Sequence, residues 1–300
     1  MSETSNQYAM QDPRSQYPRP PFPKQPQPAP GTIFEMDPAP DHGEDSYRGF
    51  GRMEGRRALI TGGDSGIGRA TAIAFAREGA AVAINYLDAE SRDAASLQEL
   101  IEAEGGTLVR LPGDLTDEAF CTQLVADAVD QLGGLDVLVN NAGKQVYQES
   151  IHDISTEQFD ATFKTNVYAM FWLSKAAVPH LPPGGSIINV TSIQGYKPSG
   201  TLLDYASTKG TQVEFTKALA KQLADDGIRV NAVAPGPFWT PLQPSGGQPQ
   251  DKIEEFGSQV PLGRPGQPAE IAPTFVFLAT QEAGYITGEV IGVTGGDPTF

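Results

Sequence analysis

Cysteine, basic residues and long apolar runs are all scarce in this sequence of 300 residues. Cys121 is the only cysteine, so no internal disulfide can form and a reducing compartment suits the chain. Lysine and arginine number 21 against 37 aspartates and glutamates, a formal net charge of -16. Nucleic acid and anionic membranes bind clustered basic residues, so we expect neither as a partner. No run is long enough to span a bilayer and no leader pattern is present, so the sequence predicts a cytoplasmic protein.

Histidine is equally sparse. His42, His152 and His180 lie far apart and show no metal-ligand spacing. Neither a zinc site nor a catalytic triad built on histidine has support, and we predict no bound metal.

Proline is concentrated at the N-terminal end of the chain. Ten of the 25 prolines precede residue 50, as in "YPRPPFPKQPQPAPG", where fixed φ angles and missing amide hydrogens oppose helix and sheet. We therefore treat residues 1–50 as an extension that cannot fold alone and residues 51–300 as one domain. Pro-rich leaders are usually solvated. Bulky apolar residues spaced through this one predict instead that it packs across its own domain or a neighbouring subunit: Tyr17, Phe22, Phe34, Met36, Tyr47 and Phe50.

Beyond the extension, short apolar runs alternate with stretches of helical period. "RRALIT", "AAVAINY", "LDVLVNNAG" and "GSIINVTS" are runs of the first kind, and "GRATAIAFAREG" and "AASLQELIEAEG" are of the second. Strands that are apolar on both faces are typical of a parallel sheet covered by helices on both sides. We predict a single Rossmann-like, doubly wound α/β domain of about seven strands, with its ligand at the carboxyl ends of the strands.

The turn "TGGDSGIGRA", residues 61–70, directly follows the first apolar strand and opens a helix. Its glycines at 62, 66 and 68 permit a tight turn, the approach of backbone amides to a pyrophosphate, and close packing of helix on strand. The spacing departs from the usual Gly-x-Gly-x-x-Gly, and the Gly-Lys-Ser/Thr of a nucleoside-triphosphate loop is absent. A dinucleotide is the predicted ligand, against the alternative of a merely tight connection.

Five motifs in one order narrow the prediction further. These are "TGGDSGIG", "NNAG" at 140–143, Asn166 in "KTNVYAMF", Ser192 in "INVTSIQG", and "YASTK", which holds Tyr205 and Lys209. Together they resemble the signature of the short-chain dehydrogenase/reductase family over about residues 55–296. The Pro-rich leader that runs into "SYRGFGRMEGRRALITGG" is further similar to a bacterial branch of such oxidoreductases, often described as general stress proteins.

The resemblance implies a catalytic set of Asn166, Ser192, Tyr205 and Lys209. Tyr205 would be the general acid or base, Ser192 would hold the substrate oxygen, Lys209 would bind the nicotinamide ribose, and Asn166 would complete a water relay to Lys209. A free phenol has a pKa of about 10, so acting near neutrality needs roughly 4 kcal/mol in favour of its anion. A cation ~4 Å away in an effective dielectric of about 20 contributes on the order of 4 kcal/mol. We therefore expect Lys209, four residues along the helix, to lower the pKa of Tyr205.

The resemblance also assigns cofactor contacts along the strand ends. The predicted cofactor-binding residues are Gly62, Asp64, Ser65, Gly66, Ile67, Gly68, Asn85, Tyr86, Asp114, Leu115, Asn140, Asn141, Ala142, Gly143, Tyr205, Lys209, Pro235, Gly236 and Thr240. Neither Asn85 nor Tyr86, at the expected tip of the second strand, is acidic, so NADP is preferred over NAD. Asp88 keeps NAD possible if the strand ends later, and Arg69 could assist a 2′-phosphate. A helix cap is the alternative for Asp114.

The substrate is less well defined. The loop over residues 236–258 reads as a mobile lid, in which Phe238, Trp239 and, from outside it, Tyr196 line an apolar mouth beside Ser192 or simply pack the loop. An aldehyde or ketone reduced to an alcohol is predicted. A sugar or polyol dehydrogenase using NAD and a non-catalytic NAD(P)-binding sensor or scaffold are the alternatives. By family analogy, long helices carrying Phe171, Trp172 and Phe215 would pair the chains into a homotetramer.

Overall fold

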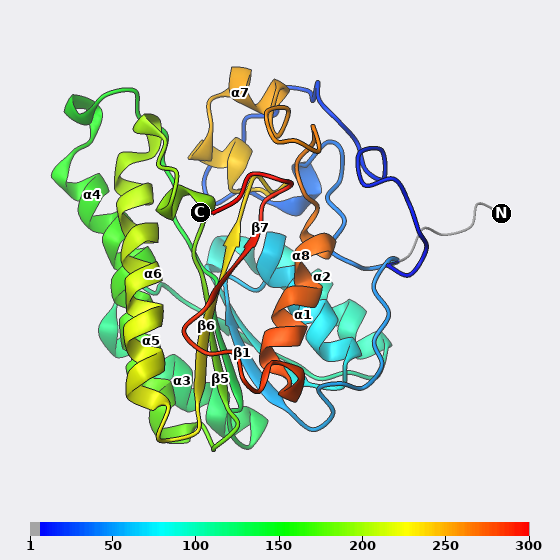
Figure 1. Cartoon of the computed structure of the whole chain (residues 1–300), viewed down its shortest axis with the longest axis vertical. Coiled ribbons are helices and arrows are strands. Elements are labelled where there is room, and N and C mark those ends of the chain that lie inside the picture. The colour runs from blue at the N-terminus through cyan, green and yellow to red at the C-terminus, as the bar shows by residue number, and fades with distance from the viewer. Residues whose placement is uncertain (1–6, 300) are drawn as a thin grey trace.

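The computed structural model describes residues 7–299 as a central parallel sheet with helices on both of its faces (Figure 1). The sheet has seven strands in the order β3-β2-β1-β4-β5-β6-β7. Its strands are β1 (Arg57–Thr61), β2 (Ala81–Tyr86), β3 (Leu108–Pro112), β4 (Val137–Asn140), β5 (Ser186–Val190), β6 (Arg229–Pro235) and β7 (Val290–Val293). The prediction of one doubly wound α/β domain with about seven strands is confirmed.

Two helical layers enclose the sheet. The helices are α1 (Gly66–Arg77), α2 (Ser91–Ala103), α3 (Glu118–Leu132), α4 (Thr156–Phe163), α5 (Ala169–Ala177), α6 (Leu203–Leu223), α7 (Gln250–Glu254) and α8 (Pro268–Ala279). Helices α1, α2 and α8 pack on one face and α3, α5 and α6 on the other, each around its own apolar cluster. Strands β4, β5 and β6 are buried along their whole length, which explains their continuous apolar runs. Within residues 7–299, no helix is both long and apolar enough for a bilayer span.

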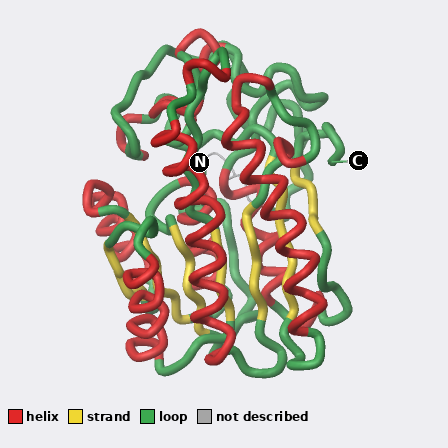
Figure 2. The backbone as a smooth tube through the Cα atoms, turned by 90° about the vertical axis from the view of Figure 1, so that its left-hand side faces the viewer, coloured by secondary structure: helices red, strands yellow, loops and turns green. Residues whose placement is uncertain are grey.

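The order of the strands sets the position of the site. From β1 the chain moves outward through β2 to β3, then returns to the other side of β1 with β4 and continues to β7. Strand order therefore reverses between β1 and β4, and ligands of open α/β sheets bind in the crevice outside the carboxyl ends at such a point. Those ends face the top of the molecule, where loops, α7 and part of the extension gather (Figures 1 and 2).

The N-terminal extension packs on its own domain, as predicted. Phe22 and Met36 are buried against Trp239 and Ile253, both of which are completely buried. The rings of Phe22 and Trp239 are 4.4 Å apart, and the Trp239 indole N–H donates to the Pro38 carbonyl at 2.8 Å. The extension thus supplies part of the fold's apolar interior.

Not every apolar residue of the extension takes part. Tyr47 is buried and its hydroxyl donates to Glu78 at 2.7 Å, whereas the hydroxyl of half-buried Tyr17 donates to Asp41. Phe34 and Phe50 remain 45% and 71% exposed, although Arg92 lies over the Phe34 ring and Tyr8 contacts the Phe50 ring. For these two side chains, packing against a neighbouring subunit stays a prediction.

Candidate functional site

The turn between β1 and α1 is built to bring backbone close to a ligand. Gly62 and Gly66 have φ angles of 57° and 51°, in the left-handed region that favours glycine. A Cβ at Gly68 would lie 2.0 Å from the Gly62 carbonyl oxygen, so the helix can approach the strand only with glycine there. Ser65 is the N-cap residue and its side chain makes no capping hydrogen bond. The first amides of α1 therefore face the crevice with the positive end of the helix dipole, as a pyrophosphate requires.

The "NNAG" loop after β4 supports this turn. The Asn141 side chain donates to the carbonyls of Thr61 and Gly62, both at 2.9 Å, and the Thr61 hydroxyl accepts from the backbone amides of Asn141 and Ala142. Gly143 follows at the position nearest Lys209, whose Nζ would lie 3.9 Å from a Cβ at that glycine. The loop thus connects the predicted dinucleotide turn with the predicted catalytic lysine.

Two of the predicted cofactor-binding side chains form hydrogen bonds within the protein. Asn140 donates to Ser174 and to Asn189, which links β4 to α5 and β5. Asn85 is 2% exposed, and its side chain donates to the carbonyls of Leu111 and Gly113 in and after β3. These amides hold neighbouring strand ends together and are directed into the protein, which sequence spacing could not distinguish from direction into the crevice.

The remaining predicted contacts near β2 and β3 differ in exposure. Tyr86 and Leu115 are buried in the two apolar clusters, whereas Asp114 is exposed and accepts from the Thr116 amide at 2.9 Å. The helix-cap alternative for Asp114 is wrong, because the N-cap of α3 is Asp117. Ile67 packs partly buried on the α1 side of the core. Asp64 is buried, and this burial together with the charge of Glu90 raises its pKa well above the usual range.

The four predicted catalytic residues converge on the other side of the crevice. Tyr205 and Lys209 lie one turn apart on α6, and the Lys209 Nζ is 5.3 Å from the centre of the Tyr205 ring. Ser192 follows β5, and its hydroxyl lies close enough to the Tyr205 phenol to lower the pKa of that phenol. Asn166 is buried in the π-helical turn Lys164–Tyr168, next to α5. A π-turn within a helix is a frequent feature of functional sites.

Burial governs the titration of the pair on α6. It raises the pKa of Tyr205 to about 12, although the nearby Ser192 hydroxyl acts in the opposite direction. It also lowers the pKa of Lys209 to about 7. The expectation that Lys209 lowers the pKa of Tyr205 toward 7 is therefore wrong for the protein without its cofactor, because loss of water disfavours both the phenolate and the ammonium. At neutral pH the phenol is protonated, the form that can donate a proton.

Comparison with known proteins agrees with this geometry. A family model described as enoyl-(acyl carrier protein) reductase matches residues 62–297. The uncharacterized oxidoreductase YhxD of Bacillus subtilis (strain 168) is 57% identical over 93% of this chain and 94% of its own. General stress protein 39 of the same strain is 49% identical, with 89% and 93% coverage. NADPH-dependent aldehyde reductase 1, chloroplastic, of Arabidopsis thaliana is 44% identical, with 89% and 94% coverage.

Solved structures give the same answer. A short chain dehydrogenase from Burkholderia cenocepacia J2315 in complex with NADP superposes with a TM-score of 0.77 at 33% identity, over 82% of this chain and 98% of that one. The chain belongs to the short-chain dehydrogenase/reductase family. The resemblance found in its motifs is thereby confirmed, as is its similarity to oxidoreductases named general stress proteins.

In this short-chain dehydrogenase/reductase, the predicted lid, residues 236–258, is in contact with other parts of the chain on two sides. On one side Trp239 and Ile253 contact the extension. On the other, the Gln145 side chain donates to the Gly247 carbonyl at 2.7 Å and the Tyr147 amide to that of Gly246. The lid therefore sits between the extension and the loop after β4.

This arrangement changes the interpretation of the predicted substrate mouth. Trp239 has no exposed surface, and Phe238 is 5% exposed and packs against Gly266, so both pack the loop instead of lining a mouth. Tyr196 is half-buried, and the charged residues that act on its phenol are Lys217, Glu214 and Glu289, on α6 and before β7. Ser192 is the one predicted substrate contact that lies beside Tyr205.

The predicted contacts at the start of the lid lie at the crevice. Pro235 ends β6, and the Gly236 amide donates to Val293 in β7 at 2.9 Å. Thr240 is buried, and its methyl group would be 3.0 Å from a Cβ at Gly66. The lid thus begins in direct contact with the glycine-rich turn.

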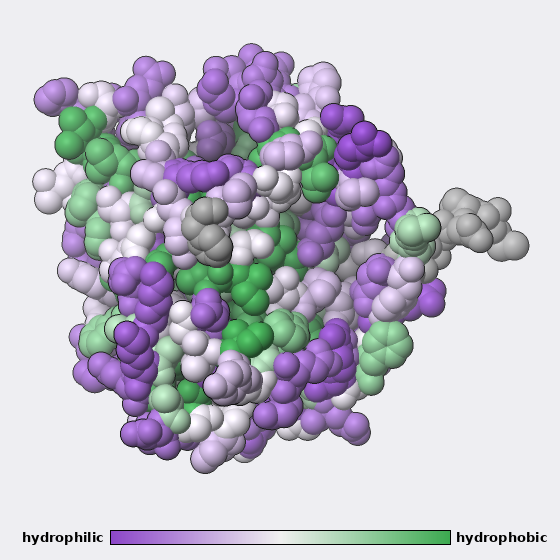
Figure 3. Space-filling model, in the orientation of Figure 1, coloured by the Kyte–Doolittle hydropathy of each residue, from purple (hydrophilic) through white to green (hydrophobic). Residues whose placement is uncertain are grey.

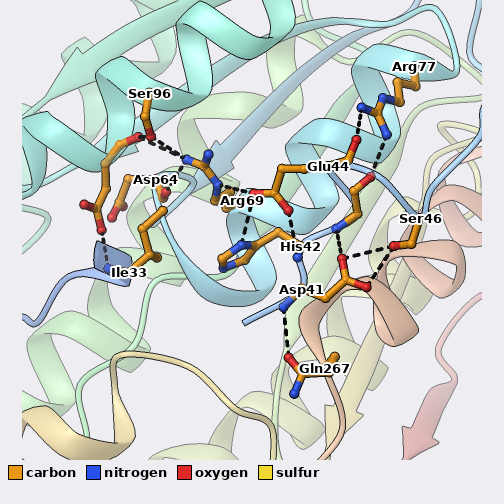
Figure 4. A network of polar contacts seen from close by, with 12 residues as sticks. Ile33, Asp41, His42, Glu44, Ser46, Asp64, Arg69, Arg77, Ser96 and Gln267 are labelled. Carbon is orange, nitrogen blue, oxygen red and sulfur yellow. Dashed lines mark hydrogen bonds and ion pairs between the residues drawn. The ribbon is translucent and has the colours of Figure 1, made fainter. Parts of the chain in front are cut away.

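A polar network that the sequence did not predict joins the extension to the same turn (Figure 4). Arg69, on α1, donates to the Glu44 carboxylate, to the Asp93 carbonyl and to the Ser96 hydroxyl, each at 3.1 Å. Although burial opposes its ionisation, contacts with His42 and Arg69 lower the pKa of Glu44 to about 2. The guanidinium of Arg69 is thus engaged by Glu44, and the expectation that it assists a 2′-phosphate is wrong.

Replacement of Lys209 by methionine should stabilise the protein without its cofactor by on the order of 4 kcal/mol near neutral pH. Lysine in the unfolded chain titrates at about 10.4, and burial brings the native value to about 7. Between these values the unfolded chain binds more protons, so native stability rises with pH. The advantage of Lys209→Met should therefore grow as pH falls through this window and level off below about 7. Denaturant unfolding across pH measures it.

Lys175→Met is the matched control, since Lys175 is an exposed lysine of α5. The change should alter the free energy of unfolding by under about 0.5 kcal/mol, because the side chain is exposed. Equal stability of native protein and Lys209→Met at all pH values would contradict the assigned pKa.

Proposed function

We propose that this protein is an NADP(H)-dependent oxidoreductase that reduces an aldehyde or ketone to an alcohol, with Tyr205 as the proton donor. The observation that carries the proposal is the convergence of Ser192, Tyr205 and Lys209 opposite a glycine turn whose helix-start amides have no side-chain cap and face the crevice. The buried phenol is protonated at neutral pH, which is the form that carbonyl reduction requires of its proton donor. The test is a substrate panel. Oxidation of NADPH or NADH is followed with aldehydes and ketones, and reduction of NADP or NAD is followed with sugars and polyols.

The crevice fits a dinucleotide. The amides at the start of α1 and the closely packed glycines would hold the pyrophosphate, and Lys209 would bind the nicotinamide ribose. When bound, the nicotinamide supplies the hydride. Ser192 orients the substrate oxygen by a hydrogen bond, and Tyr205 donates its proton to that oxygen. Lys209 supplies positive charge beside the phenolate that remains.

NADP is the preferred cofactor on two grounds. Neither of the last two residues of β2, Asn85 and Tyr86, is acidic, and both are buried; the Glu90 carboxylate, which lies close by, is engaged by the Leu87 amide at 2.9 Å. The raised pKa of buried Asp64 also reduces the negative charge that would oppose a 2′-phosphate. The Burkholderia complex with NADP and the Arabidopsis aldehyde reductase named for NADPH support the same choice.

The native protein should show a kcat/KM at least ~10-fold higher with NADPH than with NADH. Leu87→Asp should reverse this preference, because a carboxylate at the strand tip accepts bonds from a ribose 2′-hydroxyl and repels a 2′-phosphate. Leu87 is 39% exposed, so the change should leave folding intact. Leu87→Asn, without the charge, is the control. A higher kcat/KM with NADH in the native protein would reject the assignment.

The alternative to an enzyme is a non-catalytic sensor or scaffold that binds NADPH. The substrate panel distinguishes the two. Such a protein would bind NADPH without turnover. All four catalytic side chains are present, which favours turnover. NAD-dependent oxidation of a sugar or polyol in the same panel, with no carbonyl reduced, would select the other alternative.

We propose a homotetramer in the cytoplasm. Phe159, Tyr168 and Phe171 leave an apolar surface exposed on α4, α5 and the turn between them. A second surface lies at β7, an outer strand of the sheet, and hydrophobic residues gather near it in the middle of the face in Figure 3. Exposed apolar patches and open sheet edges are typical of subunit contacts. The mass in solution tests the assembly.

A further inference from the structure

Gln212 is the next residue along the helical face that carries Tyr205 and Lys209. On α6 these three positions are separated by four and three residues, so their side chains lie in one row. Gln212 is 2% exposed, although glutamine is mostly found at the surface of proteins. A buried amide must find partners for both of its ends, so its contacts indicate what it does.

Both ends of the Gln212 amide reach the catalytic set. Its oxygen accepts a hydrogen bond from Lys209 Nζ at 3.0 Å, and its nitrogen donates to the backbone carbonyl of Asn166 at 2.5 Å. The other bond of Lys209 Nζ goes to the Val190 carbonyl at 2.7 Å. The Asn166 side chain is itself engaged by the backbone of Lys144 and by the Thr208 hydroxyl.

We propose that Gln212 is a positioning residue that bridges Lys209 to the Asn166 carbonyl and favours the charged form of the lysine against the effect of burial. The position is the one where a water relay between Asn166 and Lys209 was expected from the family resemblance. An amide oxygen stabilises an ammonium by accepting from it, as a water would, and the amide nitrogen fixes that oxygen against the π-helical turn. Unlike water, the amide does not release a proton near neutral pH, so the direct path from Lys209 to Asn166 is closed to proton transfer. This inference rests on the proposed function of Lys209.

The test measures the pKa of Lys209 without turnover. The difference in free energy of unfolding between Lys209→Met and the same protein with Lys209 stops growing, as pH falls, at the native pKa of the lysine. We call this pH the levelling point, and it can be measured in the native protein and in the Gln212→Leu variant. Leucine fills a similar volume and removes both hydrogen bonds. We expect the levelling point to fall by about one pH unit in Gln212→Leu, the size of one hydrogen bond to a charged group.

Gln267→Leu is the matched control, because Gln267 is also 2% exposed and its amide oxygen accepts from the Asp41 backbone, away from the catalytic set. It should lower stability without moving the levelling point. A Gln212→Leu variant that loses stability equally at all pH values, or the same shift in Gln267→Leu, would overturn the proposal. If Gln212→Leu does not fold, Gln212→Met provides the same measurement with a more flexible side chain.

Failure of this inference is distinguishable from failure of the proposed function. The levelling point requires neither substrate nor cofactor, so it decides the role of Gln212 even if no carbonyl is reduced. If turnover is found, its pH profile in Gln212→Leu should shift in the same direction, with little change in the KM for the carbonyl.

Discussion

Tyr205→Phe should lower kcat for carbonyl reduction by at least ~10³-fold and leave cofactor binding nearly unchanged. The substitution removes one hydroxyl, which lies beside Ser192 and is the predicted proton donor to the substrate oxygen. Positioned acid catalysis contributes about 10² to 10⁴ in rate. The phenyl ring keeps the packing of a side chain that is 8% exposed. Steady-state kinetics and titration with NADPH separate the two effects.

Tyr196→Phe is the matched control for the loss of a phenol. Tyr196 lies close in sequence but its charged neighbours belong to α6 and the segment before β7. Activity should stay within about twofold of native, because the charged groups that act on the Tyr196 phenol lie outside the catalytic set. Retention of more than about a tenth of native turnover by Tyr205→Phe would show that another group supplies the proton.

The sequence predicted what depends on local pattern. The alternation of apolar runs with helical periods determines a doubly wound sheet, and the spacing of Tyr205 and Lys209 on one helix places them on one face whatever the rest of the chain does. The glycine turn is equally local, since positive φ angles and close approach exclude other residues at Gly62 and Gly68. For such features a short stretch contains all the information required.

Features that depend on tertiary contacts were not predictable in the same way. An aromatic residue in a Gly/Pro-rich loop has the same local sequence whether it faces a ligand or, like Trp239, an extension far away in the chain. Burial set the pKa values of Tyr205 and Lys209, and burial is a property of the whole fold. The sequence does indicate that Gln212 is unusual, because it is a polar residue in the buried row of α6. Its hydrogen bond to Asn166, however, could not be predicted, because Asn166 comes from another helix.

Deletion of residues 1–45 should lower the melting temperature by ~10 °C or more. The extension buries Phe22 and Met36 and covers Trp239 and Ile253. Each such side chain contributes about 1.5 to 3 kcal/mol when fully buried, and ~1 kcal/mol shifts the melting temperature of a domain this large by about 2 °C. The cut also removes Thr32 and the backbone amide of Ile33, which donate to the Asp93 carboxylate, so a buried charge loses its partners. Differential scanning calorimetry measures the change.

The same deletion should also weaken substrate binding, because the extension supports the lid on the side opposite the loop after β4. Phe22→Ala tests this support with the full chain: it should lower the melting temperature by part of the deletion's effect and raise the KM for the carbonyl. Phe50→Ala is the control within the extension, since Phe50 is 71% exposed and its loss should cost under about 0.5 kcal/mol. A truncated protein that melts within about 2 °C of the full chain would mean that the contacts with Trp239 add little stability. The extension would then not be needed to stabilise the domain.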